Sequence, residues 1–476
     1  MKTTAKKLLS LLLAVMLVLG TLAFTGCRKV MPNFEMPEGG YDGSEVTITF
    51  YHTMGQSLQS VLNSAISYFN TLYPNIHIEH TQIGGYDDVR NQISTELTAQ
   101  RQPNIAYCYP DHVALYNVAD AVVTLDQFIE NTQVITRADG STEIMGLTQE
   151  QIDDFVDGYW NEGKSFGDGK MYALPLSKST ELLFYNKTFF TENELSVPTT
   201  WDEMEEVCRQ IKAIDPTCIP LGYDSEANWF ITLCQQYGSP YTSLDEKGHF
   251  LFNNDTNVNF VKELRSWHKE GLVTTQEIYG AYTSGLFTAQ GEGEIKSYMS
   301  IGSSGGTVHQ LPTQDGDGKY PFEVGIASIP QVDPSKPYAI SQGPSLCIFQ
   351  SENPQEVIAS WLFMKFLTTD LAFQADFSMA SGYVPVIESA KNDPFYQQFL
   401  SKADGFDNLA ALGASVCLAQ KDAYFTSPAF NGSTVAREQV GALLQKCMTE
   451  KWSDEELDAK IRETFRDAVT ECEYRS

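Results

Sequence analysis

Aromatic and acidic side chains near the ends of expected strands could bind a ligand that carries many hydroxyl groups. A flat aromatic face stacks on the C–H surface of such a ligand, and planar polar groups hydrogen-bond its hydroxyls. Asp111 could accept two hydroxyl hydrogen bonds, or it could cap a helix that begins at His112. Each aromatic candidate could equally belong to a core; the candidates are Tyr86, Tyr109, Trp229, Tyr282 and Tyr383.

The sharpest local signal is the run Gly302-Ser303-Ser304-Gly305-Gly306. Glycine lets the backbone approach a ligand closely. A helix N-terminus that carries hydroxyl groups can hold an anion or a cluster of hydroxyls. Taken alone, the same run could be a plain Gly/Ser turn.

The sequence contains no complete metal-binding motif. The run 315–319 resembles the start of a calcium loop, but no Glu follows at the required distance, so a surface turn is predicted. The zinc-protease signature HExxH does not occur. We therefore expect a protein that is not an enzyme, with no cofactor and no metal site. An extracellular glycoside hydrolase is the alternative, because acids are plentiful and paired carboxylates could do that chemistry.

The elements that would position these residues begin with alternating strands and helices. Residues 46–50 alternate apolar and polar side chains, which predicts a strand, and residues 58–72 have apolar side chains at three- and four-residue steps, which predicts a helix. Another strand, helix and strand follow at 76–78, 89–97 and 105–109. This order predicts a mostly parallel sheet with helices on both faces. Ligands bind such sheets beyond the carboxyl ends of the strands, here the loops 52–56, 84–87 and 109–112.

A second unit follows further along the chain. Residues 172–176 and 182–186 are typical of strands, with the polar run Ser177-Lys178-Ser179-Thr180-Glu181 between them. Thr200 and Glu203 form a capping box at the start of a predicted helix.

The first 27 residues indicate where the protein works. Three lysines precede an apolar run at 8–19, which is too short to span a membrane and is typical of a secretory signal peptide. Gly26-Cys27 resembles the lipobox of bacterial lipoproteins, which implies lipidation of Cys27 and an anchored protein on the extracellular face of the cytoplasmic membrane. The alternative is an ordinary signal peptide with a chance cysteine. Residues 27–44 have no periodicity and are predicted to be a tether.

Charge and cysteine content limit the possible partners. Removal of residues 1–26 takes away three lysines and no acid, so the formal charge moves from -29 to -32. Such a chain lacks the basic surface that nucleic acid requires. Eight scattered cysteines remain after Cys27, so a zinc site is not expected. Two states of these cysteines remain open. They could form disulfides, for which Cys208 with Cys218 or Cys234 are the nearest candidates, or they could be buried free thiols.

The body of the chain resembles the extracellular solute-binding proteins of ABC importers, in the carbohydrate-associated family 1. Each matching segment is weak alone, and the ordered set behind a lipobox carries the resemblance. In chain order the segments are Phe50 to Met54, Leu174-Pro175, Phe184 to Lys187, Pro198 to Glu203, Tyr298 to Gly305, and Gly382-Tyr383-Val384-Pro385.

The resemblance implies an α/β fold of the type II periplasmic-binding-protein kind, with two lobes, hinge-crossing strands and a central ligand cleft. The crossings are expected near residues 174–180, 297–304 and 341–346. The first lobe would then comprise 45–176 with 300–342, and the second 177–299 with 343–476. A ligand that touches both lobes would stabilise the closed form.

Within the family, the glycerol-3-phosphate-binding members are the most similar. Their pattern, together with the candidates above, implies a ligand site made of Tyr86, Asp111, Ser179, Trp229, Ser303, Ser304, Gly343, Tyr383 and Arg437. Asp111 stands where those members have Glu, and Lys178 replaces a small polar residue, which leaves the ligand open to a sugar. No Trp follows the turn at 302–306, which favours a small ligand or a phosphate.

The function implied is capture of a carbohydrate or sugar-derived solute and its delivery to an ABC permease, by a monomer that performs no chemistry. A sensory lipoprotein that reports the solute without importing it is the alternative that the sequence leaves open.

Overall fold

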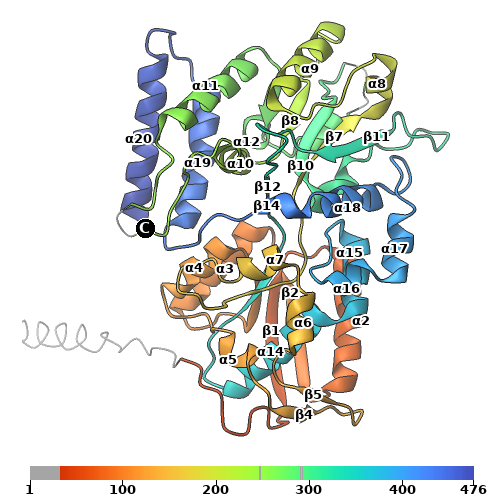
Figure 1. The fold of residues 1–476 in the computed structure, drawn as a ribbon, viewed down its shortest axis with the longest axis vertical. Helices are drawn as coiled ribbons and strands as arrows, with labels where there is room; N and C mark the ends of the chain where they lie inside the picture. The colour runs from red at the N-terminus through yellow and green to blue at the C-terminus, as the bar shows by residue number, and fades with distance from the viewer. Residues whose placement is uncertain (1–32, 246–247, 290, 292) are drawn as a thin grey trace, which may run out of the picture.

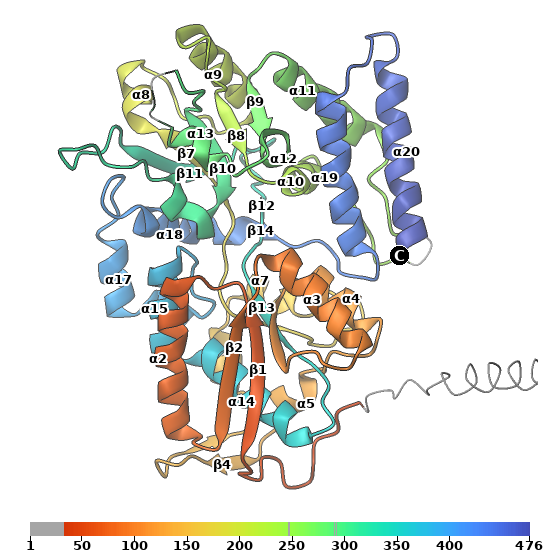
Figure 2. The ribbon, with the colours of Figure 1, turned by 180° about the vertical axis from the view of Figure 1, so that it is seen from behind.

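A computed structural model describes residues 33–245, 248–289, 291 and 293–476 of the 476-residue chain. Two α/β lobes lie one above the other, with several chain segments running between them (Figures 1 and 2). The two-lobed α/β architecture expected from the resemblance is confirmed.

The first lobe is built on a five-stranded sheet of order β2-β1-β3-β13-β6. Its strands are β1 (Val46–His52), β2 (Ile76–Gln82), β3 (Ile105–Cys108), β6 (Leu174–Pro175) and β13 (Ser345–Ile348). β1 runs parallel to β2 and β3, whereas β13 is antiparallel to β3 and β6. The predicted strand–helix alternation over residues 46–109 is confirmed, with α2 (Gln56–Leu72) and α3 (Tyr86–Thr98) in their expected places.

Shorter elements and two long helices complete the first lobe. They are α4 (Pro110–Asn117), α5 (Asp126–Ile129), the hairpin β4 (Val134–Thr136) and β5 (Thr142–Ile144), α6 (Gln149–Asp154), α7 (Asp157–Glu162), α14 (Pro354–Thr369), α15 (Leu371–Ser381), α16 (Glu388–Lys391) and α17 (Pro394–Leu400).

The second lobe is built on a mixed sheet of order β11-β7-β10-β8-β9. Its strands are β7 (Glu181–Asn186), β8 (Leu221–Tyr223), β9 (Val273–Thr275), β10 (Met299–Ser303) and β11 (Val324–Ser328). Its helices are α8 (Lys187–Glu192), α9 (Trp201–Ile214), α10 (Glu226–Gln236), α11 (Asp255–Lys269), α12 (Gln276–Tyr279), α13 (Ser284–Phe287), η1 (Ser304–Gln310), α18 (Leu409–Ala419), η2 (Lys421–Ala423), α19 (Ser433–Thr449) and α20 (Leu457–Arg475). The capping box predicted at α9 is present: Thr200 accepts from the Glu203 backbone amide.

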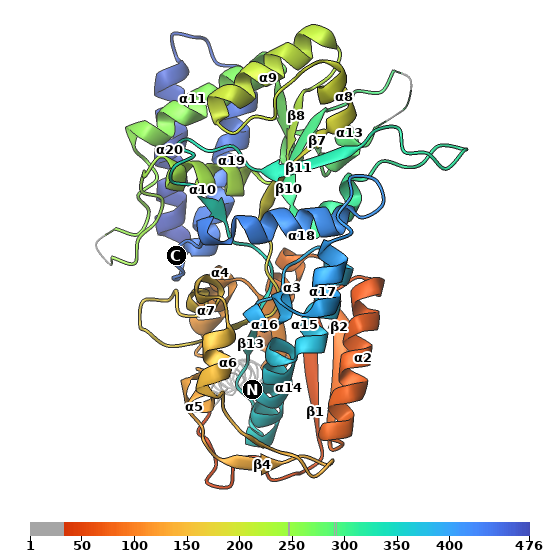
Figure 3. The ribbon, with the colours of Figure 1, turned by 45° about the vertical axis from the view of Figure 1, so that its right-hand side comes forward.

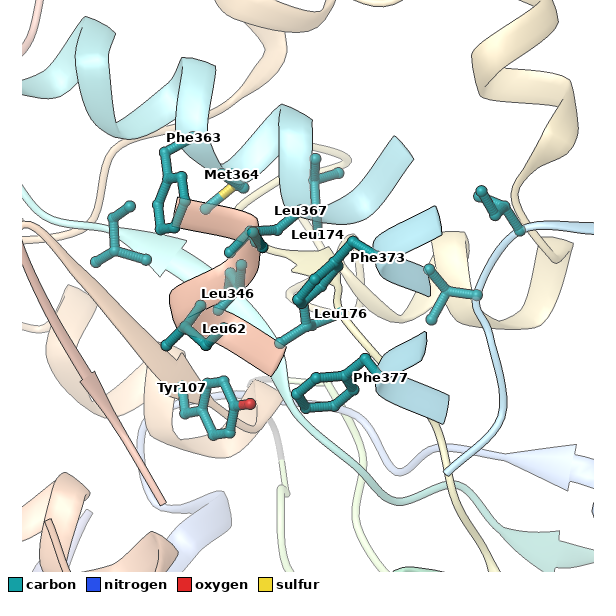
Figure 4. Close-up of a cluster of buried hydrophobic side chains, with 14 of the residues drawn as sticks. Leu62, Tyr107, Leu174, Leu176, Leu346, Phe363, Met364, Leu367, Phe373 and Phe377 are labelled. Atoms are coloured by element: carbon teal, nitrogen blue, oxygen red, sulfur yellow. The ribbon is translucent and has the colours of Figure 1, made fainter. Parts of the chain in front are cut away.

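Two large apolar cores hold the lobes. One fills the first lobe and continues through the hinge to α18 and one side of the second sheet; the other fills the second lobe between its sheet and α9–α11, α19 and α20. Figure 4 shows the first core, where α2, α14 and α15 bring Leu62, Phe363 and Phe373 onto Leu174 and Leu346. Figure 3 shows α18 lying along the lower edge of the second lobe.

Sheet membership corrects the expected lobe boundaries. Residues 300–342 were expected in the first lobe, but β10 and β11 both pair with β7 in the second sheet. Residues from 343 onward were expected in the second lobe, but β13 pairs with β3 and β6 in the first sheet. The assignment of 45–176 to the first lobe agrees with the sheet, and α18 to α20 lie in the second lobe.

The chain crosses between the lobes at two of the three expected places. β6 lies in the first sheet and β7 in the second, so residues 176–180 cross; residues 341–344 cross back between β12 (Ala339–Ile340) and β13. β12 pairs with β14 (Tyr424–Phe425) in a small separate ladder. The expected crossing at 297–304 is wrong, because β10 lies entirely within the second sheet; the chain instead returns between α15 and α18.

The segment expected to be a tether lies partly on the first lobe. The ring of Phe34 stacks on Phe128 with centroids 5.0 Å apart, and its backbone amide donates to Gln350 Oε1 at 2.8 Å. Further along, Gly39 O accepts from Gln133. Residues 33–44 therefore belong to the folded body. The predicted signal peptide (1–26) and Cys27 lie outside the described residues.

The eight cysteines within the described residues are buried free thiols. The sequence left disulfides and free thiols open, and the structure shows free thiols. Within the same residues, no helix is both long and apolar enough to cross a bilayer.

Candidate ligand-binding cleft between the lobes

Two adjoining cavities lie between the lobes, lined by residues of α4, α10 and α19 among others. Figure 1 shows α10 and α19 on the second-lobe side, facing α3 and α4 on the first-lobe side. The inner one, of about 80 Å³, reaches the hinge, and the outer one measures about 430 Å³. Tyr109, Asp111 and Arg437 line both. A cleft with walls from both lobes is the arrangement in which a ligand can bias the lobes toward closure.

A tyrosine cluster lies on the first-lobe side of the cleft, and its member Tyr109 lines both cavities. Tyr86 stacks on Tyr109 with ring centroids 4.6 Å apart, and the hydroxyl oxygens of Tyr86 and Tyr383 lie 3.4 Å from each other. Tyr86 begins α3 and Tyr109 follows β3, at the carboxyl ends of their strands as expected. Burial raises the pKa of Tyr86 well above its usual value, so its phenol stays protonated and able to donate.

Asp111 lies half-buried in the first turn of α4 and lines both cavities. Its Oδ1 accepts from the backbone amide of His112 at 3.1 Å. The capping role weighed from the sequence is wrong, because α4 begins at Pro110 with Tyr109 as its N-cap and Asp111 lies within the first turn. A carboxylate has further lone pairs, so Asp111 can also accept from a ligand. His112 behind it is buried, which lowers the pKa of its ring.

Arg437 reaches the cleft from α19 in the second lobe. Its guanidinium donates to Asn228 Oδ1 on α10, which fixes its position. The positive charge of Arg437 acts to lower the pKa of Tyr109, across the cleft, and the pKa of Glu181, in the interior of the second lobe. The structure thus brings Arg437, Asp111 and Tyr109 together, although Tyr109 and Arg437 are more than 300 residues apart in the sequence.

The serines of the predicted site divide between the hinge and the interior. The hydroxyls of Ser303 and Ser179 lie 3.4 Å apart beside the first hinge crossing, and Ser303 Oγ accepts from the Gly305 amide. Ser304 is 0% exposed at the start of η1, so in this arrangement it is closed to a ligand.

Gly343 is buried in the second hinge crossing with φ +92°. A Cβ there would lie 2.5 Å from Ser177 O and 2.9 Å from Lys178 Cα. Its place is therefore explained by the close approach of the two crossings, a backbone conformation that favours glycine.

Trp229 does not line the cleft. It is 0% exposed in the core of the second lobe, stacked on Tyr223 at 4.5 Å. The expectation of a sugar platform there is wrong in this arrangement, because α10 turns this side of the helix inward. Tyr282, another aromatic candidate, is 67% exposed on the surface of the second lobe.

Sequence reasoning missed Glu162, which ends α7 and lines the inner cavity. Its Oε1 lies 2.5 Å from Lys178 Nζ, and its Oε2 accepts from Ser341 Oγ at 3.0 Å and Thr426 Oγ1 at 3.2 Å. Side-chain exposure is 0% for Lys178 and 4% for Glu162. The departure from the family pattern at Lys178 could have pointed to a buried acidic partner. That partner, Glu162, lies 16 residues earlier in a helix that carries no sequence signal of its own.

Glu181 is a second buried carboxyl that the sequence left unassigned. It begins β7 immediately after the first crossing and accepts from Tyr223 OH at 2.5 Å. Burial raises its pKa to about 7, while Tyr223, Asn228 and Arg437 act in the opposite direction. No group of three or more acidic, His or Cys side chains suited to a metal occurs among the residues that the structure describes.

Comparisons with known proteins agree with this geometry. The sn-glycerol-3-phosphate-binding periplasmic protein UgpB of Escherichia coli K12 is 24% identical over 381 residues, covering 76% of this chain and 79% of its own. The structure is similar to UgpB from Mycobacterium tuberculosis in complex with glycerophosphocholine (TM-score 0.69, 18% identity, 89% and 98% covered). It is also similar to the cyclic α-maltosyl-1,6-maltose binding protein from Arthrobacter globiformis (TM-score 0.65, 16% identity, 90% and 99% covered).

The solved structures share the type II periplasmic-binding fold with this chain. The family model for bacterial extracellular solute-binding proteins matches residues 64–401, from within α2 to the end of α17, a span that includes the crossings at 176–180 and 341–344 and the tyrosine cluster. This chain belongs to the bacterial extracellular solute-binding proteins.

Proposed function

We propose that this protein is the lipid-anchored substrate-binding component of an ABC importer, which captures a sugar, an oligosaccharide or a sugar-derived solute and delivers it to the permease. The observation that carries the proposal is the cleft, whose walls come from both lobes and converge on Tyr109, Asp111 and Arg437. A ligand held by both lobes binds the closed form better, and the permease would recognise that form. The proposal treats the protein as a monomer without catalytic chemistry.

The lobes that close in this proposal follow the sheets. We place residues 33–175 and 345–400 in one moving unit, and 181–340 with 409–476 in the other. The segments 176–180, 341–344 and 401–408 would then serve as the hinge.

A glycerol-3-phosphate-type ester is the second candidate ligand. It is favoured by the similarity to UgpB of E. coli and by the single guanidinium of Arg437 shared by both cavities. The inner cavity of about 80 Å³ adjoins the outer one of about 430 Å³, and Tyr109, Asp111 and Arg437 line both.

Thermal unfolding of the full-length protein in detergent tests the ligand class. A ligand at 100 times its dissociation constant adds about 2.7 kcal/mol to the free energy of unfolding. A panel of mono- and disaccharides, glycerol-3-phosphate and glycerophosphocholine is expected to contain at least one compound that raises the melting temperature. Hydrolysis of a bound glycan would instead support the enzyme alternative.

The anchor is tested separately, because it concerns Cys27. Cells fed labelled palmitate are expected to label the wild-type protein and not Cys27→Ser. The variant would be released from the membrane fraction. Because the described body begins at residue 33, only five residues separate Cys27 from it, a reach of at most roughly 20 Å. The first lobe would therefore lie close to the membrane surface.

A further inference from the structure

The hinge side of the inner cavity is lined by hydroxyl groups whose hydrogen atoms are already engaged. Ser341 Oγ and Thr426 Oγ1 both donate to Glu162 Oε2, at 3.0 and 3.2 Å. A hydroxyl has one hydrogen and two lone pairs. Both oxygens therefore offer the cavity only acceptor positions.

Glu162 keeps these hydroxyls in that orientation because it is itself held in place. Lys178 Nζ bonds Glu162 Oε1 at 2.5 Å and also lies within hydrogen-bond distance of Ser345 Oγ (3.2 Å) and Gly343 O (3.4 Å). An ammonium group has three donors and no acceptor, so these contacts use its full capacity. The carboxylate is thereby kept as an acceptor, and its charge is compensated within the hinge.

Other groups around the cavity add to its acceptor character. Gln342 Oε1 is buried and has no hydrogen-bond partner among the described residues, and Asp111 presents a carboxylate from the first lobe. The charge of Glu162 is balanced by Lys178, and that of Asp111 is opposed by Arg437 across the same cavity. The lining therefore carries no surplus positive charge for a doubly charged phosphate, whose bare oxygens can only accept.

We propose that the hinge side of the cleft is a subsite for the vicinal hydroxyls of an uncharged sugar, which donate to Ser341, Thr426 and Gln342. Glu162, held by Lys178, is the positioning residue that fixes the two hydroxyls as acceptors. The inference rests on the proposed function and specifies the ligand class of its site. It departs from a phosphate-binding hinge, for which Lys178 would otherwise be the natural cation.

Isothermal titration of the full-length protein in detergent tests the subsite with glucose, maltose, sucrose, glycerol-3-phosphate and glycerophosphocholine. We expect the wild-type protein to bind one of the sugars at least about tenfold more tightly than glycerol-3-phosphate. Thr426→Val removes the hydroxyl at nearly constant volume and is expected to lower sugar affinity about tenfold. Thr426→Ser keeps the hydroxyl and is the matched control, with affinity near the wild-type value.

Glu162→Gln separates positioning from a general structural role. The new amide would donate to Ser341 and Thr426, whose own hydrogens would then turn toward the cavity as donors. The ratio of sugar affinity to glycerol-3-phosphate affinity is therefore expected to fall about tenfold, whereas a purely structural defect would lower both affinities alike. Glu162→Gln with Lys178→Met provides the same comparison without an unpaired buried ammonium if the single variant folds poorly.

Each result bears on a different claim. Tighter wild-type binding of glycerol-3-phosphate than of every sugar, or unchanged sugar affinity in Thr426→Val, would overturn the subsite and leave the proposed function standing. An unchanged affinity ratio in Glu162→Gln would overturn the positioning role. If the wild-type protein binds none of the five compounds, the proposed ligand class is overturned, and the subsite with it.

Discussion

Glu181 occupies the point where the first hinge crossing enters the second sheet, and its protonation links stability to pH. It is fully buried beside Tyr223, and burial raises its pKa from 4.5 to about 7. Between these two pH values the folded protein keeps a proton that the unfolded chain has released. The free energy of unfolding must therefore decrease as the pH rises from about 4.5 to about 7.

Replacement of Glu181 by Gln is expected to remove this part of the pH dependence. A shift of this size corresponds to on the order of 3 kcal/mol for an isolated group. The variant should match the wild-type protein near pH 4.5 and exceed it in stability at pH 8, as measured by urea unfolding at both values. Equal slopes with pH in the two proteins would show that Glu181 titrates normally.

Asp111 offers a residue-scale test of the cleft itself. Asp111→Asn keeps the acceptor for the His112 amide but removes the charge that strengthens hydrogen bonds from ligand hydroxyls. A charged hydrogen bond contributes about 1.5–3 kcal/mol, so ligand affinity measured by titration is expected to fall about tenfold or more, with little change in melting temperature. Asp153→Asn, at an exposed position on α6 outside the lining of both cavities, is the control that should bind normally.

Residue type alone did not separate cleft from core. Tyr109 and Trp229 are both aromatic residues near the starts of helices, yet Tyr109 lines the cleft and Trp229 is buried against Tyr223 of β8. The difference depends on which face each helix turns to its sheet, and that is set by packing between distant segments. Glu162 was missed for the same reason, since its partners at 178, 341 and 426 meet only in the folded hinge.

At the scale of elements, the hinge is a close contact between two crossing segments. Ser179 and Gln342 pair across it in a short antiparallel bridge, and Lys178 pairs in the same way with Val384. Gly343 allows this approach through its positive φ and missing side chain. The crossings therefore act as one unit, which favours bending at their ends over sliding between them.

Gly343→Ala is expected to destabilise the protein by roughly 2–5 kcal/mol, because strain at positive φ adds to a clash with backbone atoms of the first crossing. Urea unfolding measures the loss. Gly306→Ala is the matched control, since its added Cβ meets no atom within 4 Å. A Gly343→Ala protein as stable as the control would contradict the packed hinge.

Local patterns predicted elements well and their partners poorly. Alternation and helical spacing over residues 46–109 are local properties, and β1 to β3 follow them. The lobe of β10 depends on its pairing with β7 more than 100 residues earlier, which no local period encodes. Residues 33–44 carry no period either, and their attachment depends on one ring, Phe34, that stacks on Phe128.

At the scale of the whole molecule, contacts between the lobes outside the hinge set how readily the cleft closes. Arg90 on α3 lies 3.2 Å from Glu438 on α19, and Thr434 Oγ1 donates to the backbone oxygen of Asp111 at 3.2 Å. Both contacts join the first lobe to the second at the mouth of the outer cavity. They exist only when the lobes are close, so they favour the form that holds the ligand.

Glu438→Gln is therefore expected to shift the population toward the open form without affecting the fold. A partly exposed ion pair contributes up to about 1 kcal/mol, so ligand affinity should fall by a factor of about two to five. The effect should shrink at high salt, because exposed charges are screened there. Titration at low and high ionic strength measures both, and X-ray scattering should show a larger radius of gyration for the variant at a subsaturating ligand concentration. Glu463→Gln removes a comparable surface pair with Lys460 on α20, away from the cleft, and should change neither quantity. If both variants bind alike, the Arg90–Glu438 contact contributes nothing to closure, and the hinge and the ligand alone set it.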